Sequence, residues 1–187
     1  MKSHDGRLTR RYFLRRSLGL ILSGAVLETF FNDFSALAFQ KQYNWRFCKK
    51  CNAFFFDGRK AKGRCWDGHG HMAAGYNFYM LTAAVGENVP PGQDGWRECK
   101  KCFTLFYAGF NSHGNCSAGG MHVGQTEFYA LEFDRPAGAG EQRDWRFCNK
   151  CYSLFFDGFP SKGRCPTGNG HSAQGYNFVL KWGTRID

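Results

Sequence analysis

The sequence contains no apolar run long enough to cross a membrane as a helix. The apolar stretch from Leu18 to Leu27 is about ten residues long, whereas a hydrocarbon core of ~30 Å needs about twenty. The sequence also lacks a nucleophile elbow, a phosphate-binding loop and an isolated carboxylate pair. We therefore expect a protein that is not an enzyme.

The composition is rich in residues that form strands, tight turns and cross-links. The chain has 20 Phe, 24 Gly and 9 Cys among 187 residues, and 43% of its residues are apolar, which excludes wholesale disorder. The net charge of +10 includes +3 from residues 1–38. The remaining segment carries +7, which metal ions held by cysteine thiolates would lower to about +4. Such a mild charge makes nucleic acid an unlikely partner.

The N-terminus has the pattern of a targeting signal. The run Thr9-Arg10-Arg11-Tyr12-Phe13-Leu14-Arg15 resembles the twin-arginine export signal, and Ala36-Leu37-Ala38 offers the small residues that a signal peptidase reads. We expect a signal peptide over 1–38 and a mature domain over 39–187 without a stable membrane anchor. The resemblance implies the twin-arginine (Tat) export machinery as partner, a periplasmic or extracellular location, and metal loading before export. The alternative is an ordinary basic amphipathic tail.

Three copies of one unit follow. They begin at Trp45, Trp96 and Trp145, and each contains Trp-Arg-x-Cys-x-Lys-Cys, an aromatic run, a Gly-x-Cys and a His. The repeats cover residues 45–81, 96–133 and 145–182. They resemble tandem modules in other secreted bacterial proteins for which no function is known.

Within each unit, short aromatic and β-branched runs alternate with Gly-containing turns, which predicts an all-β fold with about four strands per unit. Three units of this size suit a closed, pseudo-threefold, β-trefoil-like arrangement. The alternative is three tandem zinc-ribbon-like modules, each stabilised by its own metal because some forty residues bury little apolar surface.

The cysteines and histidines recur with the spacing C-x2-C-x13-C-x5-H. Three thiolates and one imidazole form a tetrahedral donor set suited to Zn²⁺, and four protein ligands leave no position for an activated water, so we expect three structural zinc ions. Disulfides with a free thiol, or an iron site, are the alternatives; three cysteines per unit cannot all pair locally. The predicted ligands are Cys48, Cys51, Cys65 and His71; Cys99, Cys102, Cys116 and His122; and Cys148, Cys151, Cys165 and His171.

Other positions also recur. We expect the three repeated tryptophans to fill the core, the arginines after them to cover a metal site or an aromatic face, and the lysines between paired cysteines to offset the charge of the metal centre. Units one and three share an Asp, a Tyr and an Asn that could line a shallow sugar site, although hairpin turn chemistry explains the same residues. These candidate ligand-binding residues are Asp57, Tyr76, Asn77, Asp157, Tyr176 and Asn177.

These observations favour an exported, zinc-stabilised binding module that recognises glycans or the cell envelope. One alternative is metal handling or thiol-redox buffering, in which the nine thiolates are the function. The other is nucleic-acid binding by zinc modules, which the predicted export and the small charge disfavour.

Overall fold

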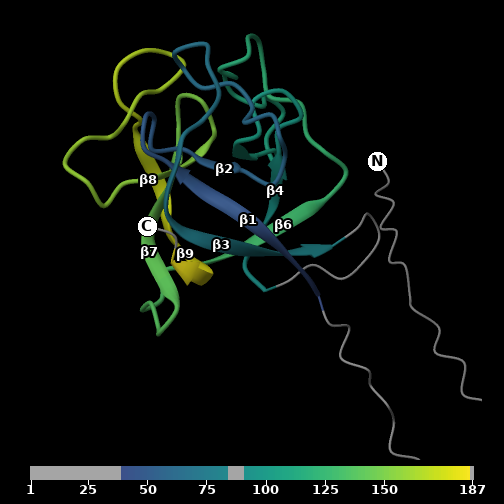
Figure 1. Cartoon of the computed structure of the whole chain (residues 1–187), viewed down its shortest axis with the longest axis vertical. Coiled ribbons are helices and arrows are strands. Elements are labelled where there is room, and N and C mark those ends of the chain that lie inside the picture. The colour runs from purple at the N-terminus through teal and green to yellow at the C-terminus, as the bar shows by residue number, and fades with distance from the viewer. Residues whose placement is uncertain (1–38, 84–90, 186–187) are drawn as a thin grey trace, which may run out of the picture. The chain divides into compact units, whose positions relative to one another are not determined.

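Every regular element in the part of the chain described by the computed structural model, residues 39–83 and 91–185, is a β-strand (Figure 1). The predicted signal peptide (1–38) lies outside these residues. The strands belong to a single sheet. They are β1 (Gln40–Cys48), β2 (Phe54–Phe56), β3 (Ala73–Ala83), β4 (Gln93–Glu98), β5 (Leu105–Tyr107), β6 (Phe128–Phe133), β7 (Glu141–Cys148), β8 (Leu154–Phe156) and β9 (Ala173–Arg185).

The three repeats, called units 1, 2 and 3 below, share one strand pattern. In each unit the first strand pairs antiparallel with a short second strand and with the last strand. The register is the same each time, with the repeated tryptophan opposite one aromatic residue on either side. These sets are Phe56–Trp45–Phe78, Tyr107–Trp96–Tyr129 and Phe156–Trp145–Phe178. The predicted all-β repeat is confirmed.

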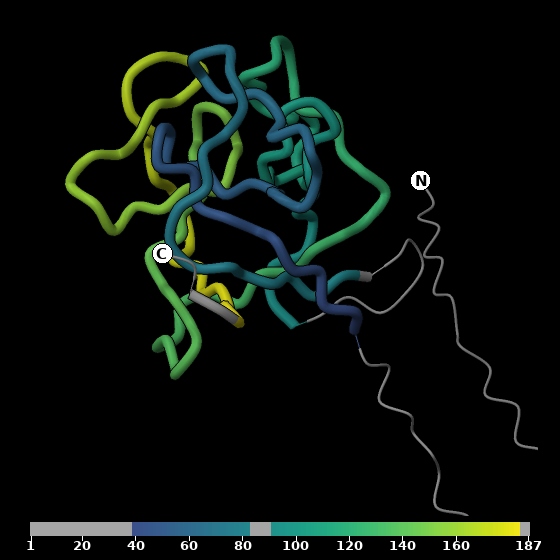
Figure 2. The backbone as a smooth tube through the Cα atoms, viewed as in Figure 1, coloured from purple at the N-terminus to yellow at the C-terminus, as the bar shows by residue number. Residues whose placement is uncertain are grey.

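The expectation of four strands per unit was wrong, because each unit forms three. The segment between the second and last strands, residues 57–72 in unit 1, contains no named strand. This segment is rich in glycine and carries the third cysteine and the histidine. Side-chain contacts of those two residues therefore fix its position, instead of the hydrogen bonds of a paired strand. The three equivalent loops lie on the same side of the strands, at the top of the view in Figure 2.

The last strands of the units close the arrangement. β3 pairs with β6, β6 with β9, and β9 with β3. The register is again equivalent, with Thr82 opposite Tyr129, Phe133 opposite Phe178, and Trp182 opposite Phe78. Each unit therefore depends on both others for backbone hydrogen bonds. The closed arrangement is confirmed, and the picture of independent beads does not describe this protein.

The short strands form a second ring of contacts near the metal-binding turns. Phe56 N–H donates to Phe103 O, Tyr107 N–H to Tyr152 O, and Phe156 N–H to Asn52 O, each at 2.9 Å. The three acceptor residues have φ of 67°, 65° and 63°. This left-handed conformation turns each carbonyl toward the neighbouring unit.

The core lies on the threefold axis and is mostly aromatic. Trp45, Trp96 and Trp145 are completely buried, which confirms the expectation that they fill equivalent space. Trp145 of unit 3 packs edge-on against Phe54 and Phe78 of unit 1, at centroid distances of 4.9 and 5.3 Å. Because fully burying one large apolar side chain contributes about 1.5–3 kcal/mol, the rings shared between units stabilise their association as well as each unit.

The boundaries between neighbouring units, called seams below, differ at one position. In the 2–3 seam Phe110 packs edge-on against Phe147 at 6.1 Å, and in the 3–1 seam Phe159 packs in the same way against Phe47 at 5.7 Å. In the 1–2 seam an ion pair replaces the two rings. Arg59 there donates to both carboxylate oxygens of Glu98, whose side chain is only 2% exposed.

The Arg59–Glu98 ion pair predicts how the 1–2 seam responds to mutation. Arg59→Ala leaves a buried carboxylate without its partner, and we expect it to lower the free energy of unfolding by about 3 kcal/mol. The double change Arg59→Phe with Glu98→Phe copies the other two seams and should recover most of that loss, because a buried ion pair can be replaced by well-packed apolar residues. Denaturant unfolding of wild type and both variants measures this. A double variant less stable than Arg59→Ala would contradict the equivalence of the seams.

Candidate metal centres

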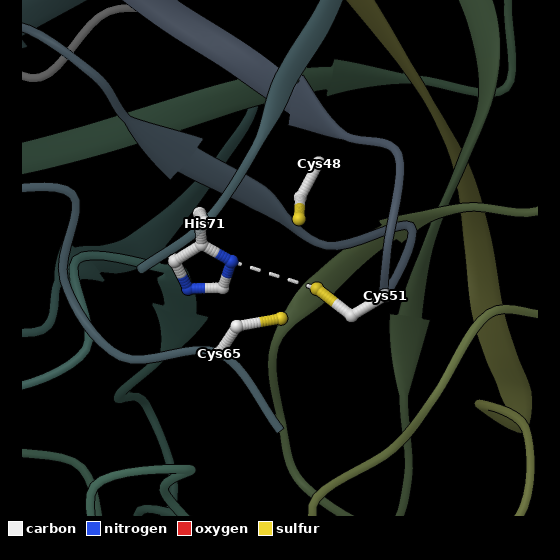
Figure 3. Close-up of side chains that lie close together, drawn as sticks. All are labelled: Cys48, Cys51, Cys65 and His71. Atoms are coloured by element: carbon white, nitrogen blue, oxygen red, sulfur yellow. Dashed lines mark hydrogen bonds between the residues drawn. The ribbon is translucent and has the colours of Figure 1, made fainter. Parts of the chain in front are cut away.

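The predicted ligands converge in three buried clusters, here called centres 1, 2 and 3 after their units. In centre 1 the side chains of Cys48, Cys51, Cys65 and His71 point toward one another (Figure 3). The ligand atoms of each cluster lie within 4.8 Å of one another, and all twelve residues are buried. The structure thus brings together every residue that the spacing identified as a metal ligand.

Local backbone geometry places the paired cysteines. Cys48 ends β1, and the next three residues turn back so that Asn52 N–H donates to Cys48 O at 2.8 Å. Asn52 takes φ of 63°, which ends the turn and starts the short strand. The same bond recurs in unit 2 from Phe103 to Cys99, and in unit 3 from Tyr152 to Cys148. Two thiols therefore face one point in each unit.

The distances fit zinc. A tetrahedral ion with Zn–S of about 2.3 Å and Zn–N of about 2.05 Å places its sulfur atoms about 3.8 Å apart, and sulfur and nitrogen about 3.6 Å apart. The Sγ atoms of Cys99 and Cys116 are 3.8 Å apart, and those of Cys148 and Cys165 are 4.0 Å apart. The histidine Nδ1 lies 3.6, 3.4 and 3.5 Å from the second cysteine Sγ in centres 1, 2 and 3. The clusters are compatible with three structural zinc ions.

A disulfide framework does not describe these cysteines. All nine are free and buried, and the sulfur separations given above are far longer than the S–S bond of about 2.05 Å. With three thiols and one imidazole facing one point, a bound cation satisfies all four donors at once.

Electrostatics favour a cation in each cluster. Hydrogen bonds with Cys51 and Cys65 hold the pKa of the Cys48 thiol far below its usual value. Burial lowers the pKa of His122, but hydrogen bonds and the negative charge of the nearby cysteines outweigh it and raise that pKa to about 9. In each cluster the first cysteine thus carries negative charge in a buried place, while burial and the neighbouring thiols raise the pKa of the second cysteine. Because protons compete for thiolates, the affinity of each cluster for metal falls as the pH falls.

An aromatic ring orients each histidine. Phe55 stacks on His71 at 4.6 Å, and the equivalent Phe106 and Phe155 stack on their histidines at 4.7 Å. The sequence interpretation treated these residues only as part of an aromatic run. Their recurrence at one offset from the paired cysteines is the signal that could have identified them as ring supports.

The centres also contact the next unit. His71 Nε2 lies 3.1 Å from Cys102 O, so its ring can coordinate through Nδ1 while its Nε2–H donates to a backbone carbonyl in unit 2. Close packing accompanies this contact. Gly63 has φ of +64°, and a Cβ there would lie 2.1 Å from Cys102 O. Only glycine permits this approach.

The lysines between the paired cysteines bind the loop that carries the third ligand. Lys50 pairs with Asp67 at 2.7 Å, Lys101 donates to Gly119 O, and Lys150 donates to Gly168 O at 3.0 Å. Negative charge on Cys65 and Cys48 contributes to raising the pKa of Lys50, after the larger effect of Asp67. The predicted role beside the metal centre thus takes a specific form, a positive charge that ties two ligand-bearing segments together.

The arginines after the tryptophans donate to carbonyls in the last strand of units 1 and 3 and, in unit 2, to a carbonyl just before the last strand. Arg46 donates to Gly75 O at 3.3 Å, Arg97 to Gln125 O at 3.1 Å, and Arg146 to Gly175 O at 2.9 Å. Arg97 also lies over the ring of Phe128, with its guanidinium 3.9 Å from the centroid. The arginines thus serve the strand pairing, and Arg97 in addition covers an aromatic face.

The candidate sugar-binding polar residues have partners within the protein. Asp57 pairs with Lys62, and Asp157 with Lys162, both at 2.8 Å. The amide oxygens of Asn77 and Asn177 accept from the backbone N–H groups of Asn44 and Asp144, at 2.9 and 2.8 Å. The asparagine bonds join the first and last strands of units 1 and 3, and the Asp–Lys pairs lie within the loop after the second strand.

The two candidate tyrosines stack on strands of other units. Tyr76 lies 4.3 Å from Trp182, nearly parallel, and Tyr176 lies 4.0 Å from Phe133. Tyr176 nevertheless remains 41% exposed. It lines a pocket that is taken up below.

Fold and sites together define an all-β protein of three cyclically paired units, each with one buried Cys3His centre. No protein-family model matches the chain, and comparison with curated proteins and with solved structures found no match. In the described residues no helix is long and apolar enough to cross a membrane. The function must therefore be argued from the sites themselves.

Proposed function

We propose that this protein is an exported, non-enzymatic binding module, stabilised by zinc, whose ligand is a neutral glycan. Two features support a binding rather than a catalytic role. Each centre offers four buried protein ligands, which leaves no coordination position for an activated water. The observation that carries the ligand proposal is an aromatic pocket away from the metal ligands.

The pocket lies in the 2–3 seam and has a volume of about 180 Å³. Its side chains are mostly aromatic, and two amides are the polar partners. Phe110 and Tyr176, 52% and 41% exposed, are available to a ligand. The lining side chains are Gln93, Tyr107, Phe110, Phe147, Gln174, Tyr176 and Phe178.

The chemistry of the lining suits a sugar ring. Aromatic faces pack against the apolar face of a pyranose, while amides and phenol hydroxyls exchange hydrogen bonds with its hydroxyl groups. No lining residue is charged, so neither a phosphate nor a carboxylate would find a counter-ion. A neutral ring of about the size of one sugar residue is the ligand class that these groups favour.

The other two seams lack this set of groups. In the 1–2 seam the equivalent of Tyr176 is Glu127, and the paired rings are replaced by the ion pair described above. In the 3–1 seam the rings are present, but the equivalent of Gln174 is Ala74. The proposal therefore assigns one site per chain, in the 2–3 seam, where the sequence interpretation assigned similar sites to units 1 and 3.

A glycan array followed by calorimetry tests the proposal. Phe110→Ala and Tyr176→Ala should each weaken binding at least tenfold, because each removes a ring that stacks on the ligand. Phe159→Ala, the equivalent position in the 3–1 seam, is the matched control and should bind like wild type. If the folded protein binds no glycan, or if Phe159→Ala weakens binding as much as Phe110→Ala, the proposal fails.

Export is the second part of the proposal. The support is the twin-arginine pattern in residues 1–38 together with cysteines that must meet metal before they meet oxidants. A route that carries folded protein would deliver the three centres already loaded. The protein for the binding experiments is therefore best taken from the exported fraction, where an N-terminus at Phe39 is expected. Intact precursor confined to the cytoplasm would contradict this part.

A further inference from the structure

The three centres are not equally supported. In centres 1 and 2 the ring nitrogen that faces away from the thiols has an acceptor in the next unit. His71 Nε2 lies 3.1 Å from Cys102 O, and His122 Nε2 lies 3.0 Å from Cys151 O. Such a bond fixes the tautomer and orientation of a metal-binding imidazole and raises its basicity.

Centre 3 lacks this bond. His171 is only 5% exposed and its Nδ1 lies 3.5 Å from Cys151 Sγ, as in the other centres. Its Nε2, however, is buried without a hydrogen-bond partner among the described residues. The equivalent carbonyl, Cys51 O, accepts the backbone N–H of Arg164 at 3.3 Å instead. The cyclic pattern is thus broken in the 3–1 seam.

Centre 2 has two further contacts at its ligands. In centre 2, Thr104 Oγ1 lies 3.0 Å from Cys102 Sγ, and Ser153 Oγ lies 3.4 Å from His122 Nε2, so both a thiolate and the imidazole have additional partners. In centre 3 Thr167 Oγ1 contacts Cys165 Sγ, with Thr167 exposed to solvent, and the backbone N–H of Ser172 donates to Cys148 Sγ at 3.5 Å. Neither contact gives His171 Nε2 a hydrogen-bond partner, although Phe155 stacks on the ring.

We propose that centre 3 is an exchangeable zinc site, which gives up its ion to a competing thiol- or carboxylate-rich ligand while centres 1 and 2 keep theirs. Partners of the metal ligands typically contribute 10- to 100-fold in metal affinity, and centre 3 lacks the one that the other histidines have. The inference rests on zinc binding alone, so it stands or falls independently of the glycan proposal. It gives the protein a capacity to exchange metal in addition to binding a ligand.

Chelator titration of the full mature protein tests the assignment. EDTA is added in steps, native mass spectrometry counts the zinc ions, and N-ethylmaleimide labels the cysteines released at each step. We expect a two-zinc species over a 10- to 100-fold range of free EDTA, with labelling confined to Cys148, Cys151 and Cys165. Simultaneous loss of all three ions, or first labelling of a cysteine from centre 1 or 2, would overturn the proposal.

A variant separates the effect of the histidine from that of the exposed loop. His171→Cys supplies a fourth thiolate, which needs no partner for a ring nitrogen. The preferential loss of the third ion should then disappear, so that all three ions leave over the same range of EDTA. If centre 3 of the folded variant still empties first, the unpartnered Nε2 is not the cause and the inference is refuted. If the variant fails to fold, the labelling pattern of the wild-type protein decides the assignment by itself.

Discussion

Replacing Cys99 by serine should unfold all three units, not unit 2 alone. Cys99 is completely buried and belongs to centre 2, where a serine cannot supply the thiolate. Structural zinc in finger peptides contributes about 10–16 kcal/mol of apparent binding energy, which is comparable with the whole stability of a domain. Centre 2, where a thiol and the imidazole both have hydrogen-bond partners, holds its ion firmly, and its loss is therefore large enough to unfold unit 2, unlike release of the exchangeable ion from centre 3.

The rings of backbone hydrogen bonds carry this damage to the neighbours. β6 of unit 2 pairs with both β3 and β9, and the turn after Cys99 provides the carbonyl that accepts from His71. Without unit 2, both other units lose strand partners and one side of their shared core.

Hydrogen exchange read by mass spectrometry measures the effect. In Cys99→Ser the protection of β3 and β9 should fall together with that of β6. His113→Ala, which changes a histidine of the same unit that is not a ligand, should keep the wild-type pattern. Loss of protection confined to residues 93–133 would contradict the closed fold and favour separate modules.

Replacing the ligand His71 by alanine should cause the second large loss of stability, and the nearby His69 serves as its control. His71→Ala removes one of four ligands from centre 1, together with the hydrogen bond to Cys102 O. We expect one bound zinc ion fewer and a fall of several kcal/mol in the free energy of unfolding. Folded proteins usually have a free energy of unfolding of about 5–15 kcal/mol, so this fall is a large part of the total. Native mass spectrometry and thermal unfolding measure the two quantities.

The control lies two residues away. His69 is exposed, and its backbone hydrogen bonds, to Asp67 and from Cys65, do not involve the ring. His69→Ala should therefore retain three zinc ions and unfold at the wild-type temperature. Equal loss of metal in both variants would mean that spacing did not identify the ligand.

The metal ligands and the repeat could be predicted from the sequence because both consist of the same residue types at fixed spacing. A Cys3His set repeated three times needs no knowledge of the fold, and a tryptophan repeated at one position indicates core packing. The closed arrangement was one of two alternatives, since an apolar last strand in each unit is compatible with either. Pairing among β3, β6 and β9 distinguishes them.

The backbone contacts between units could not be predicted, because every residue carries the same backbone groups and the sequence does not show which of them pair. The hydrogen bond from the His71 ring to Cys102 O depends on the direction in which that backbone carbonyl points. The recurrence of glycine at the position of Gly63 in all three units does indicate close packing there. The fourth strand was expected from the length of each unit, but the metal-binding loop occupies that length. Asp57 and Asn77 could equally be turn residues or ligand contacts from sequence alone, and the structure shows both bonded within the protein.

One seam contact was readable in retrospect. Glu98 stands where units 1 and 3 have Phe47 and Phe147, and Arg59 stands where the others have Phe110 and Phe159. Two departures from a repeat, opposite in charge, are the mark of a contact between the units that carry them. The structure shows that contact as the Arg59–Glu98 ion pair.

The count of zinc ions and free thiols in the native mature protein tests the account most directly. Native mass spectrometry gives the mass of the bound metal, and thiol titration after denaturation without reductant gives the number of reduced cysteines. Three zinc ions with all nine cysteines reduced is the predicted result. A folded, metal-free protein with three or four disulfides would contradict it.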